Sequence, residues 1–374
     1  MPSSLSSTLA ALATGFSLVS AQTWTSCNPL TTTCDPDPAL GMTINVDFTQ
    51  GAVNSFFSGG SPTYSSQGVE FSVVKPGDAP QLNAAFYIMF GRVEVTLKAA
   101  PGTGIVSSVV LQSDDLDEID MEWLGSRPDE VQLNYFGKGI VSDYNRGTIN
   151  SVSDTQNEWH TYTVDWTAER IIWAVDGTEL RTLTPADADT NQYPQTPMQL
   201  KFGSWAGGDP SNPAGTISWA GGTTDYSLGP FSMYVKSVMV ADYSTGTEYN
   251  YTDHSGSWES IQAIGGSVNG RLNADGELSL TATVSSGSTV SATVPAGLAT
   301  DSSTSTYTQT GWPWVAGAEP TRGSIPSGWV MTSDGKIVRA NAAASVDAPK
   351  AWTVLGVSAA SFFLGFAAIA RNIV

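Results

Sequence analysis

Short segments in which apolar and polar residues alternate recur along most of this chain, and they constrain its fold more than any other feature. Alternation with a period of two places successive side chains on opposite faces of a β-strand. Clusters of Gly, Pro, Ser and Asn separate the segments, as turns separate strands. The clearest segments are 68–74, 92–97, 107–112, 159–166, 171–176 and 233–240.

Many short strands at this spacing, with no long amphipathic helix pattern between them, predict an all-β fold. Asp176 and Gly177 separate two of the segments and form a dipeptide typical of a tight hairpin. We therefore predict a β-jelly-roll sandwich of two antiparallel sheets with a concave substrate cleft.

The segment 117–123, with the sequence DEIDMEW, has two chemically opposite faces if it forms a strand. Glu118, Asp120 and Glu122 then point to one side, and the apolar residues between and after them point to the other. We expect such a strand to lay its apolar face on the core and to place its carboxylates in a solvent-filled groove.

The spacing of the two glutamates suits chemistry on a glycosidic bond. Residues four apart on a strand are separated by about 13 Å at Cα, and side chains that lean together can bring the carboxyl groups to about 5 to 6 Å, as in a retaining glycosidase. Asp120 lies between them and can hydrogen-bond to a neighbour. Because three adjacent carboxylates cannot all ionise cheaply, one pKa should rise, as a general acid requires.

Two simpler explanations compete with catalysis: an ordinary solvated face and a calcium site. The segment lacks the glycine turn and the alternating ligands of an EF-hand loop, which excludes that type of calcium site. Trp123, directly after the acids, favours catalysis. So does a composition rich in aromatic residues and with only 14% charged residues.

Residues 117–123 resemble the D-E-I-D-x-E-[WF] signature of glycoside hydrolase family 16. From about Gln22 to about Ile261 the chain resembles, more narrowly, the fungal Crh (Congo red hypersensitive) family of cell-wall transglycosylases. The resemblance implies a retaining double displacement with Glu118 as nucleophile, Glu122 as acid/base and Asp120 as helper. It also implies a β-1,4-linked chitin donor and chitin or β-1,3/β-1,6-glucan acceptors. The residues alone leave the order of the two glutamates open.

The net charge of −19 and the pI of about 4.2 argue against nucleic acid as a partner, because the two polyanions repel each other. The 12 Trp, 12 Tyr and 13 Phe residues can stack on sugar rings. We expect a monomer that binds neutral polysaccharide and needs no cofactor and no metal.

Two stretches supply candidate substrate-binding residues. Segment 131–136 follows the acidic strand and should pair with it; its amides can bind sugar hydroxyls and its tyrosine can stack, although alternation places amides and tyrosine on opposite faces. The Gly-rich segment 201–209 and the loop to Trp219 line the acceptor side in the resembling family, with a structural role for Trp219 as the alternative. The candidates are Gln132, Asn134, Tyr135, Lys201, Trp205, Asp209 and Trp219. His160 is interpreted as a strand histidine with satisfied partners.

The N-terminal region indicates secretion. Residues 1–21 have the short apolar core and the small terminal residues of a signal peptide. Cys27 and Cys34 are the only cysteines, and in an oxidising compartment they should form a disulfide. A metal site with two thiolates is the alternative.

The remaining boundaries follow from composition. Residues 22–262 are expected to form the catalytic domain, with Asn250 in the only N-x-[S/T] sequon. Residues 263–341 read as a Ser/Thr/Gly-rich spacer and 342–374 as a GPI-attachment propeptide, with Asn341 as the attachment residue. A plain C-terminal membrane helix is the alternative. We predict a secreted, cell-surface protein that touches the membrane only through its GPI lipid and is anchored there or in the wall.

Three other functions compete with transglycosylation. An endo-β-glucanase or chitinase-type hydrolase uses the same carboxylates, and only the access of water separates the two outcomes. A non-catalytic carbohydrate-binding jelly roll and a structural cell-surface protein need no such acids. The set Glu118, Asp120 and Glu122 argues against the carbohydrate-binding jelly roll, and a structural protein predicts that Glu118→Gln changes nothing.

Overall fold

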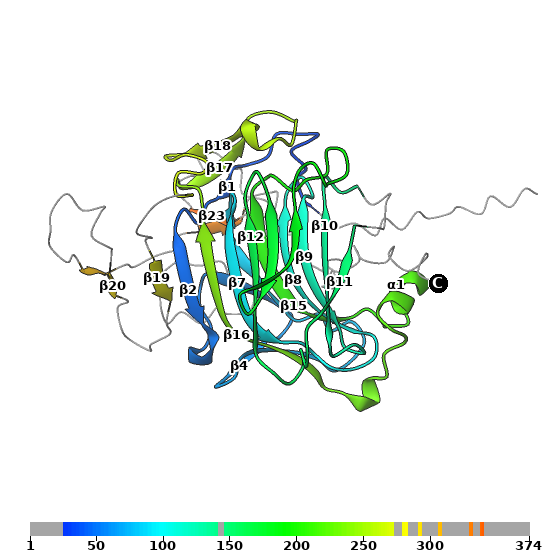
Figure 1. The fold of residues 1–374 in the computed structure, drawn as a ribbon. Helices are drawn as coiled ribbons and strands as arrows, with labels where there is room; N and C mark the ends of the chain where they lie inside the picture. The colour runs from blue at the N-terminus through cyan, green and yellow to red at the C-terminus, as the bar shows by residue number, and fades with distance from the viewer. Residues whose placement is uncertain are drawn as a thin grey trace, which may run out of the picture.

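The computed structural model describes residues 25–140 and 146–272 and five short strands beyond them (Figure 1). The expected signal peptide, most of the spacer and the expected attachment residue Asn341 lie outside the described residues. The described fold continues to Leu272, and one strand, β18 (Ile261–Ile264), crosses the expected domain boundary at residue 262.

A seven-stranded antiparallel sheet carries the acidic segment. In its two central strands the residues on both faces are buried. One face packs on the core, and neighbouring side chains cover the other. In spatial order its strands are β11 (Thr148–Ser151), β10 (Glu130–Phe136), β9 (Glu118–Leu124), β8 (Ile105–Ser113), β15 (Met198–Ala206), β6 (Gln81–Ile88) and β3 (Phe56–Gly59).

A nine-stranded sheet forms the second layer. Its strands pair antiparallel except where β19 pairs with β2. The path runs β14 (Thr178–Leu183), β13 (Ile171–Val175), β12 (His160–Trp166), β7 (Gly91–Lys98), β16 (Phe231–Asp242), β2 (Thr43–Asp47) and β19 (Ser279–Ala282), with β5 (Gly68–Val73) on β16 and β4 (Thr63–Ser65) on β5.

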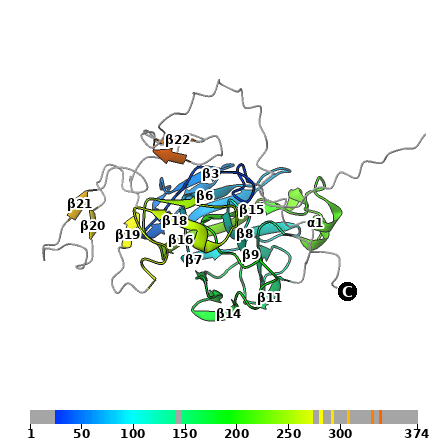
Figure 2. The same ribbon diagram turned by 90° about the horizontal axis from the view of Figure 1, so that it is seen from above.

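Smaller elements complete the described structure. A three-stranded sheet lies at the top of the large sheets in Figure 1, and in the view from above its strand β18 is seen near β16 (Figure 2). The remaining elements are β1 (Asp37–Pro38), β17 (Glu248–Tyr251) and β18 of that sheet, the pairs β20 (Ser291–Thr293) with β21 (Thr306–Thr308) and β22 (Trp329–Met331) with β23 (Ile337–Arg339), the 3₁₀ turns η1 (Phe48–Gln50), η2 (Tyr226–Leu228) and η3 (Trp258–Ser260), and the helix α1 (Ala214–Trp219). Among the helices of the described ranges, none is long and apolar enough to cross a membrane.

One continuous hydrophobic core lies between the two large sheets. Strand β7 shows how the sequence builds it: Val93, Val95 and Leu97 are buried, and the residues between them face outward. A fully buried side chain of this kind contributes about 1.5–3 kcal/mol to folding. Trp123 of β9 contacts Tyr162 of β12 edge to face, with ring centroids 4.6 Å apart, and so joins the two layers.

The predicted two-sheet, all-β architecture is therefore confirmed. All six alternating segments form strands, from β5 to β16. The predicted hairpin also forms between β13 and β14, with Asp176 at φ 49° and Gly177 at φ 77°, the left-handed values that a type I′ turn requires.

The N-terminal cysteines form the predicted disulfide, Cys27–Cys34, with Cα atoms 5.9 Å apart. The loop that it closes packs against the segment between β17 and β18, where the Nδ1 atom of His254 lies 2.5 Å from the carbonyl oxygen of Pro29. Gly256 of the same segment lies close to both Leu30 and Asp115, so the loop closed by the disulfide lies near the turn that precedes the acidic strand.

Candidate active site

The three acids of β9 share the face of the seven-stranded sheet that points away from the other sheet. Ile119, Met121 and Trp123 belong to the main core, so alternation turns Glu118, Asp120 and Glu122 to the opposite side. Strands β8 and β10 flank β9, and their directly opposed residues are Gln112 and Phe136 at Glu118, Val110 and Asn134 at Asp120, and Ser108 and Gln132 at Glu122.

The acids are more deeply buried than a solvent-filled groove implies, and that expectation was wrong in degree. Their exposed fractions are 2% for Glu118, 0% for Asp120 and 2% for Glu122. The reason is that neighbouring side chains stand on both flanking strands, whereas the sequence of β9 by itself shows nothing of these neighbours. Burial on this scale has a direct effect on ionisation.

Burial raises the pKa of both Asp120 and Glu122 well above the ordinary values. For Asp120 the charges of Glu118 and Glu122 add to the effect of burial, and the guanidinium of Arg146 opposes it. For Glu122 the charge of Glu118 adds to burial, and the hydroxyl of Ser108, 3.3 Å away, opposes it. The rise of a carboxyl pKa that the sequence predicted is found at Asp120 and at Glu122.

The proton on Asp120 has a specific role in this arrangement. Neither of its carboxylate oxygens accepts a hydrogen bond within the described structure. A hydrogen bond with Glu118 contributes to its raised pKa, which is consistent with a protonated Asp120 that donates to an ionised Glu118. The raised pKa values favour the protonated forms of Asp120 and Glu122 on either side of this hydrogen bond.

Lys201 lies two strands away on the same face, across from Val110 of β8. Its Nζ donates to Oε1 of Gln112 over 2.6 Å, and Gln112 is the residue directly opposite Glu118. Burial lowers the pKa of Lys201 to about 8, and the charges of Asp114 and Glu118 counteract that effect. The predicted site residue Lys201 thus brings a positive charge close to Glu118.

Two tryptophans and an amide gather beside the Glu122 end of the strand. The indoles of Trp205 and Trp219 stack with centroids 6.3 Å apart and an interplanar angle of 30°. Trp219, the last residue of α1, donates from Nε1 to Oε1 of Gln132 over 3.0 Å. The two tryptophans and Leu124 belong to a second, smaller apolar cluster. The structure thus brings three of the predicted binding residues, Gln132, Trp205 and Trp219, to one place.

Asn134 and Tyr135 of β10 lie on opposite faces, as alternation requires. Asn134 is opposite Asp120, and its Oδ1 accepts a hydrogen bond from the backbone of Tyr135. Tyr135 is buried in the main core, 2% exposed, and its hydroxyl accepts from the amide of Asp189. The structure therefore does not place Tyr135 with the acids, and its predicted stacking role is not supported.

Asp209 holds its own loop. Its carboxylate accepts hydrogen bonds from the amide and hydroxyl of Ser211 and, over 2.6 Å, from the hydroxyl of Tyr226. Burial acts to raise the pKa of Asp209, but these hydrogen bonds outweigh it and lower the pKa. The carboxylate is thus already engaged, which favours a role in shaping the segment that leads to Trp219.

His160 has partners on both ring nitrogens, as the sequence predicted. Nδ1 lies 2.7 Å from a carboxylate oxygen of Asp176, and Nε2 lies 3.0 Å from the carbonyl oxygen of Ser153. In the ranges 25–140 and 146–272, no three His, Cys, Asp or Glu side chains are grouped in a way that could hold a metal ion.

Sequence reasoning did not single out the surroundings of Asp117. This residue is wholly buried, and it accepts hydrogen bonds from two distant segments of the chain, around Lys138 and Thr196. Asp117 is the first residue of the DEIDMEW segment and could have been noticed for that reason. Its hydrogen-bond partners lie at positions that no sequence pattern connects to it.

Comparison with known proteins identifies the family. Residues 48–221 match the family described as glycosyl hydrolases family 16. Crh-like protein 4 of Botryotinia fuckeliana (strain B05.10) is 58% identical over 330 residues, which cover 86% of this chain and 87% of the relative. The chain belongs to the Crh-like proteins of this family.

Two further similarities support the assignment to the Crh-like proteins. Congo red hypersensitive protein 1 of Saccharomyces cerevisiae (strain ATCC 204508 / S288c) is 48% identical over 276 residues, 72% of this chain and 54% of that protein. The solved structure of Crh5 transglycosylase in complex with NAG is 53% identical, covers 63% of this chain and 99% of that chain, and gives a TM-score of 0.62. The jelly-roll fold expected from the sequence is the fold of this Crh-like structure.

Proposed function

We propose that this protein is a cell-wall transglycosylase that cleaves β-1,4-linked chitin with retention and transfers it to chitin or to β-1,3/β-1,6-glucan. The observation that carries the proposal is the arrangement of Glu118, Asp120 and Glu122 on one face, where burial raises the pKa of Asp120 and of Glu122. The similarity to a Crh5 transglycosylase that binds NAG supports the choice of substrate.

In the first step the carboxylate of Glu118 attacks the anomeric carbon of the donor. The bond to the leaving sugar oxygen breaks, and that oxygen takes the proton of Glu122. Asp120, hydrogen-bonded to Glu118, holds the attacking carboxylate in place. The product is a glycosyl ester of Glu118 and a Glu122 carboxylate.

In the second step Glu122 acts as a base. Ester formation removes the negative charge of Glu118, and that charge is one of the causes that raise the pKa of Glu122. The loss of this charge favours the ionised form of Glu122, which then takes the proton of an acceptor hydroxyl as its oxygen attacks the anomeric carbon. Glu118 leaves as a carboxylate, and the site returns to its starting state.

Hydrolysis is the second candidate, because water can replace the sugar acceptor in this step. The cluster of Trp205, Trp219 and Gln132 beside Glu122 favours transfer, since an apolar wall with an amide suits a sugar ring better than water. A lectin needs no such set of acids, and the shared face of Glu118, Asp120 and Glu122 therefore argues against a purely binding function.

The remaining assignments concern processing and location. We propose cleavage after residue 21, a spacer over 263–341, and a GPI lipid at Asn341 after removal of 342–374. Secretion to the fungal cell surface accords with the disulfide. Asn250, partly exposed on β17, is the proposed N-glycan site.

The test is an assay of the secreted protein with a chitin oligosaccharide donor and fluorescent chitin or β-glucan acceptors. Labelled products longer than the acceptor, absent in Glu118→Gln and Glu122→Gln, are the expected result. Glu94→Gln, a carboxylate on the other sheet, is the matched control and should keep full activity. Shortened donor without lengthened acceptor would establish the hydrolase instead.

A further inference from the structure

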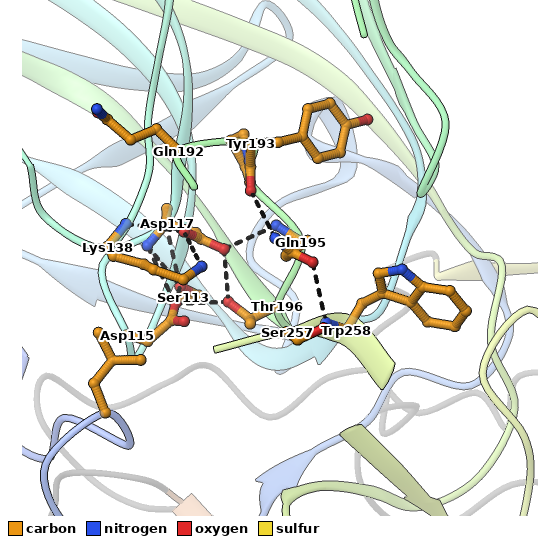
Figure 3. Close-up of polar contacts among 12 residues, drawn as sticks. Ser113, Asp115, Asp117, Lys138, Gln192, Tyr193, Gln195, Thr196, Ser257 and Trp258 are labelled. Carbon is orange, nitrogen blue, oxygen red and sulfur yellow. Dashed lines mark hydrogen bonds and ion pairs between the residues drawn. The ribbon is translucent and has the colours of Figure 1, made fainter. Parts of the chain in front are cut away.

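The residue directly before the proposed nucleophile is held by hydrogen bonds from two other segments. Figure 3 shows Asp117 at the centre of these contacts. Its Oδ1 accepts from the amide of Lys138 over 2.9 Å, and its Oδ2 accepts from the amide of Gln195 over 2.8 Å and from the hydroxyl of Thr196 over 3.1 Å. Lys138 follows β10, and the other two residues precede β15.

The backbone of Asp117 is fixed from the turn between β8 and β9 as well. Its amide donates to Oγ of Ser113 over 2.9 Å, and its carbonyl accepts from the amide of Ser113 over 2.9 Å. Within the turn, Leu116 has φ 68°, a left-handed conformation that costs free energy for a leucine. The contacts of Asp117 hold this strained turn at the point where strand β9 begins.

A second buried carboxyl, Asp115, completes the arrangement. Its Oδ1 accepts from Ser113 Oγ over 2.5 Å and from Thr196 Oγ1 over 2.6 Å. The hydroxyl of Thr196 has one hydrogen and lies between the two carboxyl groups, 2.6 Å from Asp115 and 3.1 Å from Asp117, so the two acids share it. The ammonium of Lys138 lies 3.7 Å from Asp117 and is the cation paired with the two acids.

The ionisation of this pair follows from its surroundings. Burial first, and then the charge of Asp115, raise the pKa of Asp117 to about 7, while Lys138 and the two amides oppose them. Burial also raises the pKa of Asp115. From the other side, Tyr251 of β17 faces Asp115, and its pKa is raised well above the ordinary value by burial and by Asp115, Asp37 and Asp114.

The network is anchored to the body of the fold. Oε1 of Gln195 accepts from the amide of Trp258 over 3.2 Å, and the indole of Trp258 packs edge to face on Phe90 of the core. Tyr193, two residues earlier, donates its hydroxyl to the carbonyl of Thr167 over 2.6 Å. A displacement of Asp117 would therefore require several packed segments to move together.

We propose that Asp117 is a positioning residue for Glu118, because it ties the first residue of strand β9 to the segments before β15 and after β10. This inference rests on the proposed role of Glu118 as nucleophile. The carboxylate of a nucleophile must be held within about 0.5 Å of its productive place, and a misplacement of about 1 Å can cost about 10²-fold in rate. Asp117 is a positioning residue in this proposal because its buried carboxylate is already engaged by Lys138, Gln195 and Thr196.

The test compares Asp117→Asn with Asp242→Asn in the secreted full-length protein. Asp242 is an equally buried carboxyl with pKa raised by burial to about 7, and it accepts from the amides of Gly41, Met89 and Ser244 and from Tyr249, far along the chain from Glu118. Asp117→Asn should lower kcat by about 10- to 100-fold and change the donor KM by less than about twofold. Asp242→Asn should lower the melting temperature but leave kcat unchanged at a temperature where the protein is folded.

Thr196 supplies a second, milder test in case Asp117→Asn does not fold. Thr196→Ser keeps the bridging hydroxyl and should retain wild-type kcat, whereas the isosteric Thr196→Val should lower kcat several-fold and shift the acidic limb of the pH profile. An unchanged kcat in both Asp117→Asn and Thr196→Val would overturn the proposal. Equal losses of kcat in Asp117→Asn and Asp242→Asn would also overturn it, because a general loss of stability would then explain both. Activity that survives Glu118→Gln would instead overturn the proposed function.

Discussion

Replacing Glu118 by glutamine should lower the pKa of Glu122, because the charge of Glu118 is the second cause, after burial, that raises it. The size of the effect follows from Coulomb's law. Two carboxylates about 5.5 Å apart in a medium of effective dielectric constant about 20 repel each other by about 3 kcal/mol. Since 1.36 kcal/mol corresponds to one pKa unit, the midpoint of Glu122 should fall by about two pH units.

The assay is a carbon-13 NMR titration of side-chain-labelled glutamate in the wild type and in Glu118→Gln. The carboxyl signal of Glu122 is assigned as the one that is lost in Glu122→Gln. The pKa should fall but stay above its ordinary value, because Glu122 remains buried in the variant. Glu118→Ala should give the same direction, and Glu94→Gln should leave the midpoint unchanged.

A midpoint of Glu122 that does not move in Glu118→Gln would refute the reasoning. It would mean that the two carboxyl groups are too far apart to interact, and a pair that does not interact cannot share a double displacement.

Removal of the repulsion between Glu118 and Glu122 should also change the thermal stability of the protein. Because a raised carboxyl pKa destabilises the folded state progressively as pH rises toward that pKa, Glu118→Gln should raise the melting temperature at neutral pH more than at pH 4.

Four further substitutions give three separate predictions. Trp219→Phe removes the 3.0 Å hydrogen bond to Gln132 and should raise the acceptor KM about fivefold, for about 1 kcal/mol; an unchanged KM in transfer assays would make Trp219 purely structural. Gly256→Ala should destabilise the protein by about 1–3 kcal/mol in thermal melts, because φ is +64° and a Cβ would lie 2.7 Å from a buried carboxylate oxygen. Gly177→Ala, at φ +77° with open space around it, should cost less, and equal costs would count against the close-packing argument. Lys201→Met removes a cation near the nucleophile and should move the acidic limb of the kcat/KM profile to higher pH, whereas a shift to lower pH would contradict the electrostatic role.

Local sequence pattern was sufficient for the fold and for the acidic face. Alternation with a period of two is a property of the strand itself, so it located β9 and separated Glu118, Asp120 and Glu122 from the core. It also showed that Tyr135 and Asn134 could not share a face. The structure decided which of the two accompanies the acids, because that choice depends on how β10 pairs with β9.

Contacts between distant segments could not be predicted in this way. The partners of Asp117 and the pairing of Trp219 with Gln132 join positions far apart in the sequence. The depth of burial of the acids was likewise missed, because side chains of two other strands produce it. Asp209 was expected at the substrate, yet its partners Ser211 and Tyr226 assign it to its own loop.

The alternation of β9 also governs how the protein can fold. If β9 paired with its neighbours one residue out of register, Glu118, Asp120 and Glu122 would enter the core in place of Ile119, Met121 and Trp123. Each misplaced carboxyl would cost several kcal/mol. The three costs together would exceed the free energy of unfolding of a typical domain. The seven residues that provide the catalytic acids therefore also disfavour the wrong register of β9. A variant with neutral residues at these three positions would lose catalysis and would also lose this barrier to pairing out of register.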